Sequence, residues 1–197
     1  MGFDIKDFTL GTAVEIKASL TAGGFSPQHR DRLFAVAASA MTRPANTTPY
    51  SANDAVSDNA TAGSVTPISF SPSDVNDDTI AIERCRIATD DTGVQGKQFR
   101  VWFYRSDPSA STGIVGGDNA AFSTKQGTFI GTMTGTFSTF SDGAVAVCTP
   151  DDGSRIITPP TSGAKTIFAL LETLEAFTPS ANSTAFTLTV EGLQGSA

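Results

Sequence analysis

The chain has 197 residues, with 13 basic and 20 acidic side chains that give a formal net charge of −7 at pH 7. This charge repels nucleic-acid phosphates and anionic lipid surfaces, so we expect neither nucleic acid nor a membrane as a partner. No apolar run of the sequence reaches the roughly 18 residues of a membrane-spanning helix, and acids stand where a signal peptide needs basic residues.

Strand patterns begin near the N-terminus. Apolar and polar residues alternate at 14–20, which predicts a strand with one solvated face. Residues 33–41 fit either a strand or a helix, and we interpret them as a strand because Pro44 ends the segment. A further short strand is predicted at 64–70, where Pro67 would confine it to a sheet edge or a bulge.

The centre of the chain carries the clearest strand patterns. At 79–88 the alternation predicts Ile80 on one face of a strand and Cys85 on the opposite face. Residues 97–105 form the most strongly strand-like segment, with phenylalanines and valine alternating with polar and larger aromatic residues. The segment 106–123 is rich in Gly, Ser, Asp and Pro and predicts a long surface loop.

The last third continues in the same way. Residues 128–140 and 143–149 predict three short strands, or two with a bulge marked by glycine. Two further strands are expected at 165–174 and 183–193, and a short helix around 167–175 is the alternative for the first of these.

These segments amount to eight to ten short strands without intervening helices. That arrangement indicates an all-β fold, an antiparallel β-sandwich, jelly roll or barrel. We expect residues 1–32 to form an N-terminal arm or first strand region, and residues 33–197 to form the sandwich domain. The chain is long enough to bury one core.

The sequence offers little reactive chemistry. His29 is the single histidine and lies in a polar segment, so we interpret it as a surface residue. Acids cluster at 74–78, 90–91 and 151–152, where carboxylate oxygens could bind Ca²⁺. The first cluster imitates an EF-hand loop but lacks its glycine and its final glutamate, so solvated turn acids are the favoured interpretation. We expect no catalytic residue, no metal, no cofactor and no enzymatic activity.

Two further features allow two interpretations each. Cys85 and Cys148 lie in predicted strands, where buried free thiols are expected and a disulfide is the alternative. Arg100, Trp102 and Tyr104 share one face of the strand at 97–105. The aromatic pair either binds a sugar or a protein partner, or is buried between the sheet and covering loops.

Three stretches carry a resemblance to a known group. They read "RPANTTPYSANDAV" (43–56), "GDNAAFS" (117–123) and "FALLETLEAFTPSANSTAFTLTVEGL" (168–193). Together they resemble tailed-bacteriophage virion structural proteins of the jelly-roll head decoration or cement type, which share an R-P-x-N/D-T-T-x-Y-x-x-x-D-x-V stretch. The matching loop residues are Pro44, Thr47, Thr48, Tyr50 and Asp54, whereas Pro49 stands where a small residue is more common.

The resemblance implies a structural role for this loop. Tyr50 would cap an edge of the sandwich, and Asp54 would accept hydrogen bonds from turn amides. The protein would decorate the outer surface of the phage head, bound to the major capsid protein, after synthesis in the host bacterial cytoplasm.

The resemblance also implies a homo-oligomer, for which a dimer is favoured over a trimer. The expected interface residues are Phe3, Ile5, Phe8 and Leu10 of the N-terminal segment, together with Trp102 and Tyr104. The N-terminal segment would be an arm that lies on a partner, or simply the first strand. Alternatives are a phage tail or baseplate module that binds a receptor or carbohydrate, and a hydrolase on a β-sandwich scaffold.

Overall fold

The computed structural model divides the chain into two compact units, Met1–Arg30 and Asp31–Ala197. The residues that the structure describes are 18–21, 24–27, 32–37, 40–108, 116–123, 128–158 and 162–194. Within the first unit, β1 (Ala18–Thr21) and β2 (Gly24–Pro27) pair as an antiparallel hairpin.

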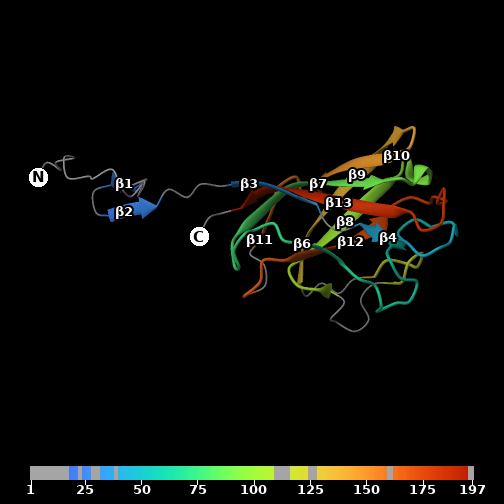
Figure 1. The fold of residues 1–197 in the computed structure, drawn as a ribbon, viewed down its shortest axis with the longest axis horizontal. Coiled ribbons are helices and arrows are strands. Elements are labelled where there is room, and N and C mark those ends of the chain that lie inside the picture. The colour runs from blue at the N-terminus through green and yellow to red at the C-terminus, as the bar shows by residue number, and fades with distance from the viewer. Residues whose placement is uncertain are drawn as a thin grey trace, which may run out of the picture. The chain divides into compact units, whose positions relative to one another are not determined.

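The second unit contains one sheet of eleven strands among the described residues (Figure 1). Its strands are β3 (Arg32–Ala37), β4 (Met41–Thr42), β5 (Ala55–Val56), β6 (Ile68–Phe70), β7 (Ile80–Thr89), β8 (Gln98–Tyr104), β9 (Phe129–Phe140), β10 (Gly143–Pro150), β11 (Ile156–Thr158), β12 (Ile167–Thr173) and β13 (Ala185–Gln194). The prediction of an all-β antiparallel fold is confirmed.

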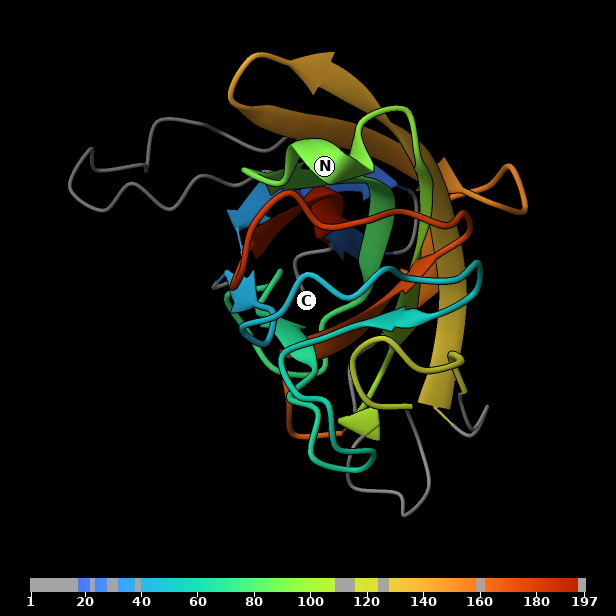
Figure 2. The ribbon, with the colours of Figure 1, turned by 90° about the vertical axis from the view of Figure 1, so that its right-hand side faces the viewer.

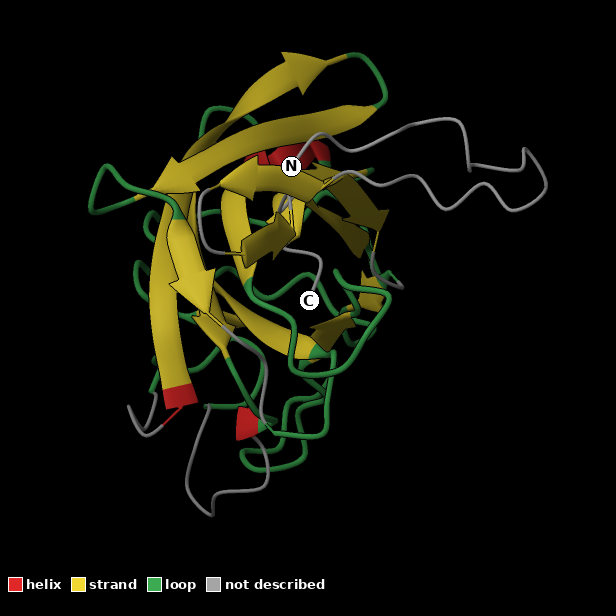
Figure 3. Ribbon diagram, turned by 90° about the vertical axis from the view of Figure 1, so that its left-hand side faces the viewer, coloured by secondary structure: helices red, strands yellow, loops and turns green. Residues whose placement is uncertain are grey.

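The strands follow one continuous order across the sheet. Its path is β3-β13-β7-β10-β9-β8-β12-β5, while β4 pairs with β13, β11 with β7 and β6 with β12. All of these pairs are antiparallel, and the sheet curls so that one face becomes the interior (Figures 2 and 3). Because β6 pairs only with β12 among the described strands, the prediction of an edge strand next to Pro67 is confirmed.

The core comes from the inward-facing residues that the alternation predicted. On β8, Phe99, Val101 and Phe103 are fully buried. Their aromatic partners lie on distant strands: the ring of Phe99 is 4.9 Å from that of Phe137 and 6.0 Å from that of Phe186. Burying each such side chain contributes about 1.5–3 kcal/mol, so the alternating strands supply most of the folding free energy.

The strand predicted at 165–174 is confirmed as β12, and the alternative of a short helix around 167–175 is wrong. Ile167, Ala169 and Leu171 point into the main core, while Leu170 on the opposite face is also buried. A strand buried on both faces gives a continuous apolar run, which periodicity cannot distinguish from a buried helix. The helical element described by the structure is instead a short 3₁₀ turn, η2 (Thr92–Val94).

A bulge in β7 corrects a second expectation. Cys85 was predicted to lie on the face opposite Ile80, yet both side chains are fully buried in the main core. In the pairing of β13 with β7, Glu191 lies opposite Arg84 and Gly192 lies opposite Ile82, so Glu83 is skipped. A Cβ on Gly192 would lie 2.0 Å from the backbone oxygen of Ala81, so this close approach requires glycine.

A second, smaller core lies on the other face of β8 and β12. It contains Ala55, Val65, Tyr104 and Leu170, with Trp102, Phe122 and Phe168 packed against it. Val65 from the loop after β5 and Phe122 from the segment 116–123 therefore cover this part of the sheet. The same segments also contribute residues to the site described below.

Candidate functional site

The loop that connects β4 to β5 has a regular internal structure. The Asn46 side chain accepts a hydrogen bond from the backbone N–H of Thr48 at 3.1 Å, and the Asp54 side chain accepts one from that of Ser51 at 2.7 Å. The expectation that Asp54 accepts turn amides is therefore confirmed. Asn and Asp side chains stabilise turns in this way because they replace a backbone acceptor.

Within this loop, the residues of the family-like motif differ in burial. Thr47, Thr48 and Pro49 are exposed, Pro44 is half-buried, and Asp54 is buried. Tyr50 is only 2% exposed. Its backbone forms a bridge with Phe177, and the two rings stack with centroids 4.5 Å apart. The loop thus has an exposed tip above a buried base.

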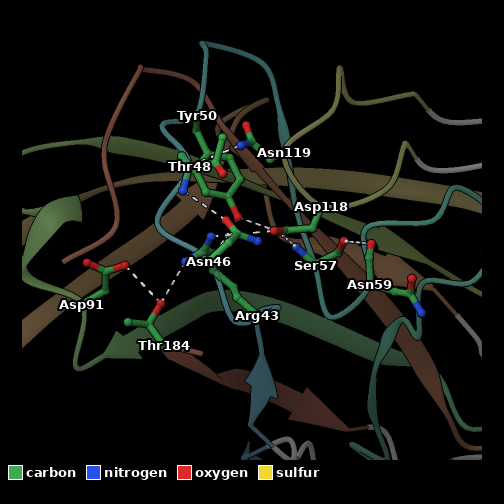
Figure 4. Close-up of polar contacts among 10 residues, drawn as sticks. All are labelled: Arg43, Asn46, Thr48, Tyr50, Ser57, Asn59, Asp91, Asp118, Asn119 and Thr184. Carbon is green, nitrogen blue, oxygen red and sulfur yellow. Dashed lines mark hydrogen bonds and ion pairs between the residues drawn. The ribbon is translucent and has the colours of Figure 1, made fainter. Parts of the chain in front are cut away.

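A buried polar cluster lies beneath this tip (Figure 4). The Tyr50 hydroxyl donates to Asp118 Oδ1 at 2.5 Å and accepts a hydrogen bond from Arg43 Nε. The Arg43 Nη2 and Asp118 Oδ2 atoms face one another as an ion pair at 3.7 Å, and neither has a hydrogen-bond partner among the described residues. Asp118 Oδ1 also accepts from the backbone N–H of Ser57 at 3.0 Å.

The cluster continues to a second buried carboxylate. Arg43 Nη1 donates to Thr184 Oγ1 at 3.2 Å, and the Thr184 hydroxyl donates to Asp91 Oδ2 at 3.1 Å. Asp91 Oδ1 in turn accepts from the backbone N–H of Gly93 and from both the backbone and hydroxyl of Ser180, each at 2.8 Å. We call Arg43, Tyr50, Asp118, Thr184 and Asp91 the Arg43 cluster.

Burial sets the ionisation of the cluster. Desolvation raises the pKa of the Tyr50 hydroxyl well above its ordinary value of 10, and its hydrogen bond to Asp118 raises it further. Tyr50 therefore stays protonated and donates to the carboxylate. Desolvation also raises the pKa of Asp118, against the hydrogen bonds from Ser57 and Tyr50 and the charge of Arg43, which lower it.

This geometry is suited to holding loops together. The side chains of Arg43 and Asp118 are 0% and 1% exposed, so a substrate in solution does not reach them. Removing one partner from a buried, hydrogen-bonded charge pair leaves the other charge uncompensated, which costs several kcal/mol. The cluster therefore makes the positions of its loops depend on one another.

The three stretches that carry the phage resemblance meet in this cluster. Arg43 and Tyr50 come from the first stretch, Asp118 from the second, and Phe177 and Thr184 from the third. Apart from Tyr50, none of these residues was predicted from the sequence to have a role of its own. The sequence showed only that the three stretches contain charged residues. The contacts of the cluster join positions 68 and 141 residues apart, and a pattern of neighbouring residues cannot predict contacts over such separations.

The aromatic pair of β8 lies on one face of the strand as expected, within the smaller core. Tyr104 is fully buried, so it presents no surface to a ligand. Trp102 is half-buried, with Phe122 stacked on it at 5.1 Å, Phe129 at 5.4 Å and the Arg100 guanidinium 5.8 Å from its ring. These neighbours occupy the surroundings of the indole that a sugar ring would need.

Three charged side chains lie around the edge of the same indole. Glu172 accepts a hydrogen bond from Trp102 Nε1 at 2.8 Å and one from Arg100 Nη1 at 3.4 Å. Arg100 Nε also lies 3.4 Å from Asp151 Oδ2. Glu172 is 5% exposed and is occupied by these donors, so the group orders the sheet surface around Trp102.

Two of the turn acids accept hydrogen bonds from other parts of the protein. Asp77 accepts from the N–H of Gly163 at 2.8 Å, and Asp78 accepts from the Ser73 hydroxyl at 2.8 Å. Within the described ranges, no three His, Cys, Asp or Glu side chains lie close enough together to hold a metal ion. His29 lies outside the described residues.

The cysteines are free and buried. Cys85 on β7 and Cys148 on β10 lie directly opposite one another. Burial raises the pKa of the Cys85 thiol well above its ordinary value and that of Cys148 to about 12. Both thiols therefore stay protonated at neutral pH, and the expectation of buried free cysteines is confirmed.

The remaining expected interface residues, Phe3, Ile5, Phe8 and Leu10, lie outside the described residues. In the part of the chain that the structure describes, no helix is long and apolar enough to cross a membrane. Comparison of the chain with protein-family models, with curated proteins and with solved structures found no match.

Proposed function

We propose that this protein is a bacteriophage capsid decoration protein, which binds the outside of the major capsid protein shell and stabilises the head as a homo-oligomer. One observation carries the proposal. The three stretches that resemble phage head proteins converge on the Arg43 cluster, so the shared residues maintain a rigid scaffold. A protein that reinforces a shell needs such a scaffold and no reaction chemistry.

The loop above the cluster suggests how contact with the shell is made. Thr47, Thr48 and Pro49 are exposed, while Arg43 and Tyr50 hold the base of the same loop. A loop that is already ordered loses little conformational entropy on binding, which leaves more of the contact energy for affinity. Binding of several copies to one shell raises the apparent affinity further by about 10²–10⁴-fold.

The alternative of a tail or baseplate sugar-binding module has less support. It relied on Trp102 and Tyr104, but Tyr104 is buried and Trp102 is surrounded by Phe122, Phe129 and Arg100. The geometry therefore favours the interpretation in which these aromatics pack between the sheet and its covering loops.

The test uses heads of the phage that encodes this chain, assembled without it. Purified protein is added, and the heads are sedimented and analysed for bound protein. We expect saturable binding at a fixed ratio to the major capsid protein, and greater resistance of the heads to heat and osmotic shock. Absence of binding, or binding without any gain in resistance, would contradict the proposal.

A loop variant makes this test more specific. Replacing both Thr47 and Thr48 by lysine changes exposed residues only, so the fold should be retained. If the loop tip contacts the shell, the variant should bind heads at least tenfold more weakly. The matched control replaces Ser51 and Ala52, which are also exposed in this loop, by lysine and should bind as the unchanged protein does.

A further inference from the structure

One face of the curled sheet is open in the described structure, on the outside of β13, β7, β10 and β9. The strand registers align its outward residues in three rows. From β13 to β9 these rows are Thr187, Ala88, Val145 and Ser138; then Thr189, Arg86, Val147 and Thr136; then Glu191, Arg84, Thr149 and Thr134. We call these twelve residues the open face.

The open face consists mostly of short side chains, and its apolar residues are Ala88, Val145 and Val147. Apart from its three charged residues, it consists of Thr, Ser, Ala and Val. These side chains are short, so none of them projects far from the sheet. Val147 at its centre is 50% exposed, and Phe140 at one end is 51% exposed. A hollow of about 500 Å³ lies beside Phe140, with Ala88, Val145 and Ala185 in its lining. Apolar side chains that are exposed or half-buried next to one another, as Phe140, Val145 and Val147 are here, indicate an interaction surface.

The charges of the face differ from those of the chain as a whole. Arg84 and Arg86 both pair with Glu191, so the open face carries one net positive charge on a protein of net charge −7. A surface with both signs can meet a copy of itself without the repulsion that two uniformly acidic surfaces would experience. This argues for a second copy of the chain as the occupant.

We infer that two copies pack open face against open face around a two-fold axis that runs along β10. Sheets pack in this way at about 10 Å separation when their facing side chains are short enough to interdigitate. Such an axis places Val145 and Val147 against the same residues of the second copy. It also places β7 of one copy opposite β9 of the other, so Arg86 meets hydroxyl residues and not another arginine.

The area of the open face determines how tightly two copies are expected to bind. Four strands about 4.8 Å apart and three rows about 6.7 Å apart cover roughly 400 Å² in plan. With Phe140 included, roughly 400–600 Å² per copy would be buried, at or below the lower limit for specific interfaces. We therefore expect a dimer that dissociates at micromolar concentration. The inference deepens the proposed function, of which a homo-oligomer is a part.

Analytical ultracentrifugation tests the inference between about 1 and 100 µM, where an interface of this size should dissociate. The unchanged protein should shift from the 20.4 kDa of one chain toward twice that mass as concentration rises. Val147→Lys should remain monomeric throughout, at least tenfold weaker in association. The matched control is Val75→Lys, because Val75 is 47% exposed, lies in the loop between β6 and β7 and is not one of the twelve residues of the open face.

A covalent readout tests the axis itself. Val147→Cys should form an intermolecular disulfide under mild oxidation with copper phenanthroline and oxygen, seen as a doubled mass on a non-reducing gel, whereas Val75→Cys should not. The native thiols do not interfere because both are fully buried. The inference is overturned if the unchanged protein stays monomeric, if it forms a trimer, or if Val147→Lys associates as strongly as the control.

These outcomes are separable from the test of capsid decoration. A monomer that still binds heads would refute the open-face dimer alone. A dimer that fails to bind heads would refute the decoration role and leave the dimer standing.

Discussion

Removing the Tyr50 hydroxyl is the most direct perturbation of the Arg43 cluster. The substitution Tyr50→Phe leaves the ring, so the 4.5 Å stack on Phe177 should persist. It removes the hydrogen bond accepted from Arg43 and the 2.5 Å bond donated to Asp118. Asp118 Oδ1 then retains only the Ser57 amide within the described network.

The size of the effect follows from these two contacts. A hydrogen bond to a charged group contributes about 1.5–3 kcal/mol, and part of this is recovered by relaxation, so we expect unfolding to become easier by about 2–4 kcal/mol. For a unit of this size, that corresponds to a fall in Tm of roughly 5–12 °C. Urea denaturation followed by tryptophan fluorescence, together with calorimetry, measures both quantities.

The control is Thr48→Ala, which removes an exposed hydroxyl from the same loop and should change stability by less than about 0.5 kcal/mol. Combining Tyr50→Phe with Asp118→Asn should cost less than the sum of the two single changes, by about 1 kcal/mol or more, because the residues share one network. If Tyr50→Phe were as stable as Thr48→Ala, the cluster would not hold the loops and the reasoning would be refuted.

Three further predictions concern separate parts of the molecule. Asp91→Ala should lower the free energy of unfolding by about 2–4 kcal/mol, because four hydrogen bonds to a fully buried carboxylate are lost; equal chemical denaturation of variant and unchanged protein would contradict this. Burial tends to raise the pKa of Glu191, but the hydrogen bonds and charges of Arg84 and Arg86 lower it overall from the ordinary 4.5. Folding therefore favours the ionised form of Glu191. The unchanged protein should be more stable than Glu191→Gln above about pH 4.5, and this difference should shrink as the pH falls through the lowered pKa. A stability difference that grows on acidification would contradict this prediction. Finally, Cys85 and Cys148 should resist iodoacetamide at neutral pH in the folded protein and react in guanidinium, as measured by mass spectrometry; rapid labelling of the native state would show that the thiols are accessible.

The strands of this protein could be predicted because their signal is local. In β13, Phe186, Leu188 and Val190 alternate with hydroxyl residues, and this period of two follows from the pleat of a single strand. Of the three short strands or two bulged strands predicted over 128–149, the structure has two, β9 and β10.

The local signal failed where a neighbouring strand changed the outcome. Cys85 and Ile80 share the core because β13 skips Glu83, and only the pairing partner reveals that bulge. Strand β12 was ambiguous because loops cover its outer face and leave Leu170 buried there. In both cases, the deciding contacts come from residues distant in sequence.

The sequence by itself determined an all-β chain, because alternating side chains encode strands within a few residues. The resemblance of the loop that contains Tyr50 also predicted that Asp54 accepts hydrogen bonds from turn amides. Only the tertiary structure showed which side chains the base of this loop contacts. The Arg43 cluster joins buried side chains up to 141 residues apart, and such a set forms only when the curled sheet brings its loops together.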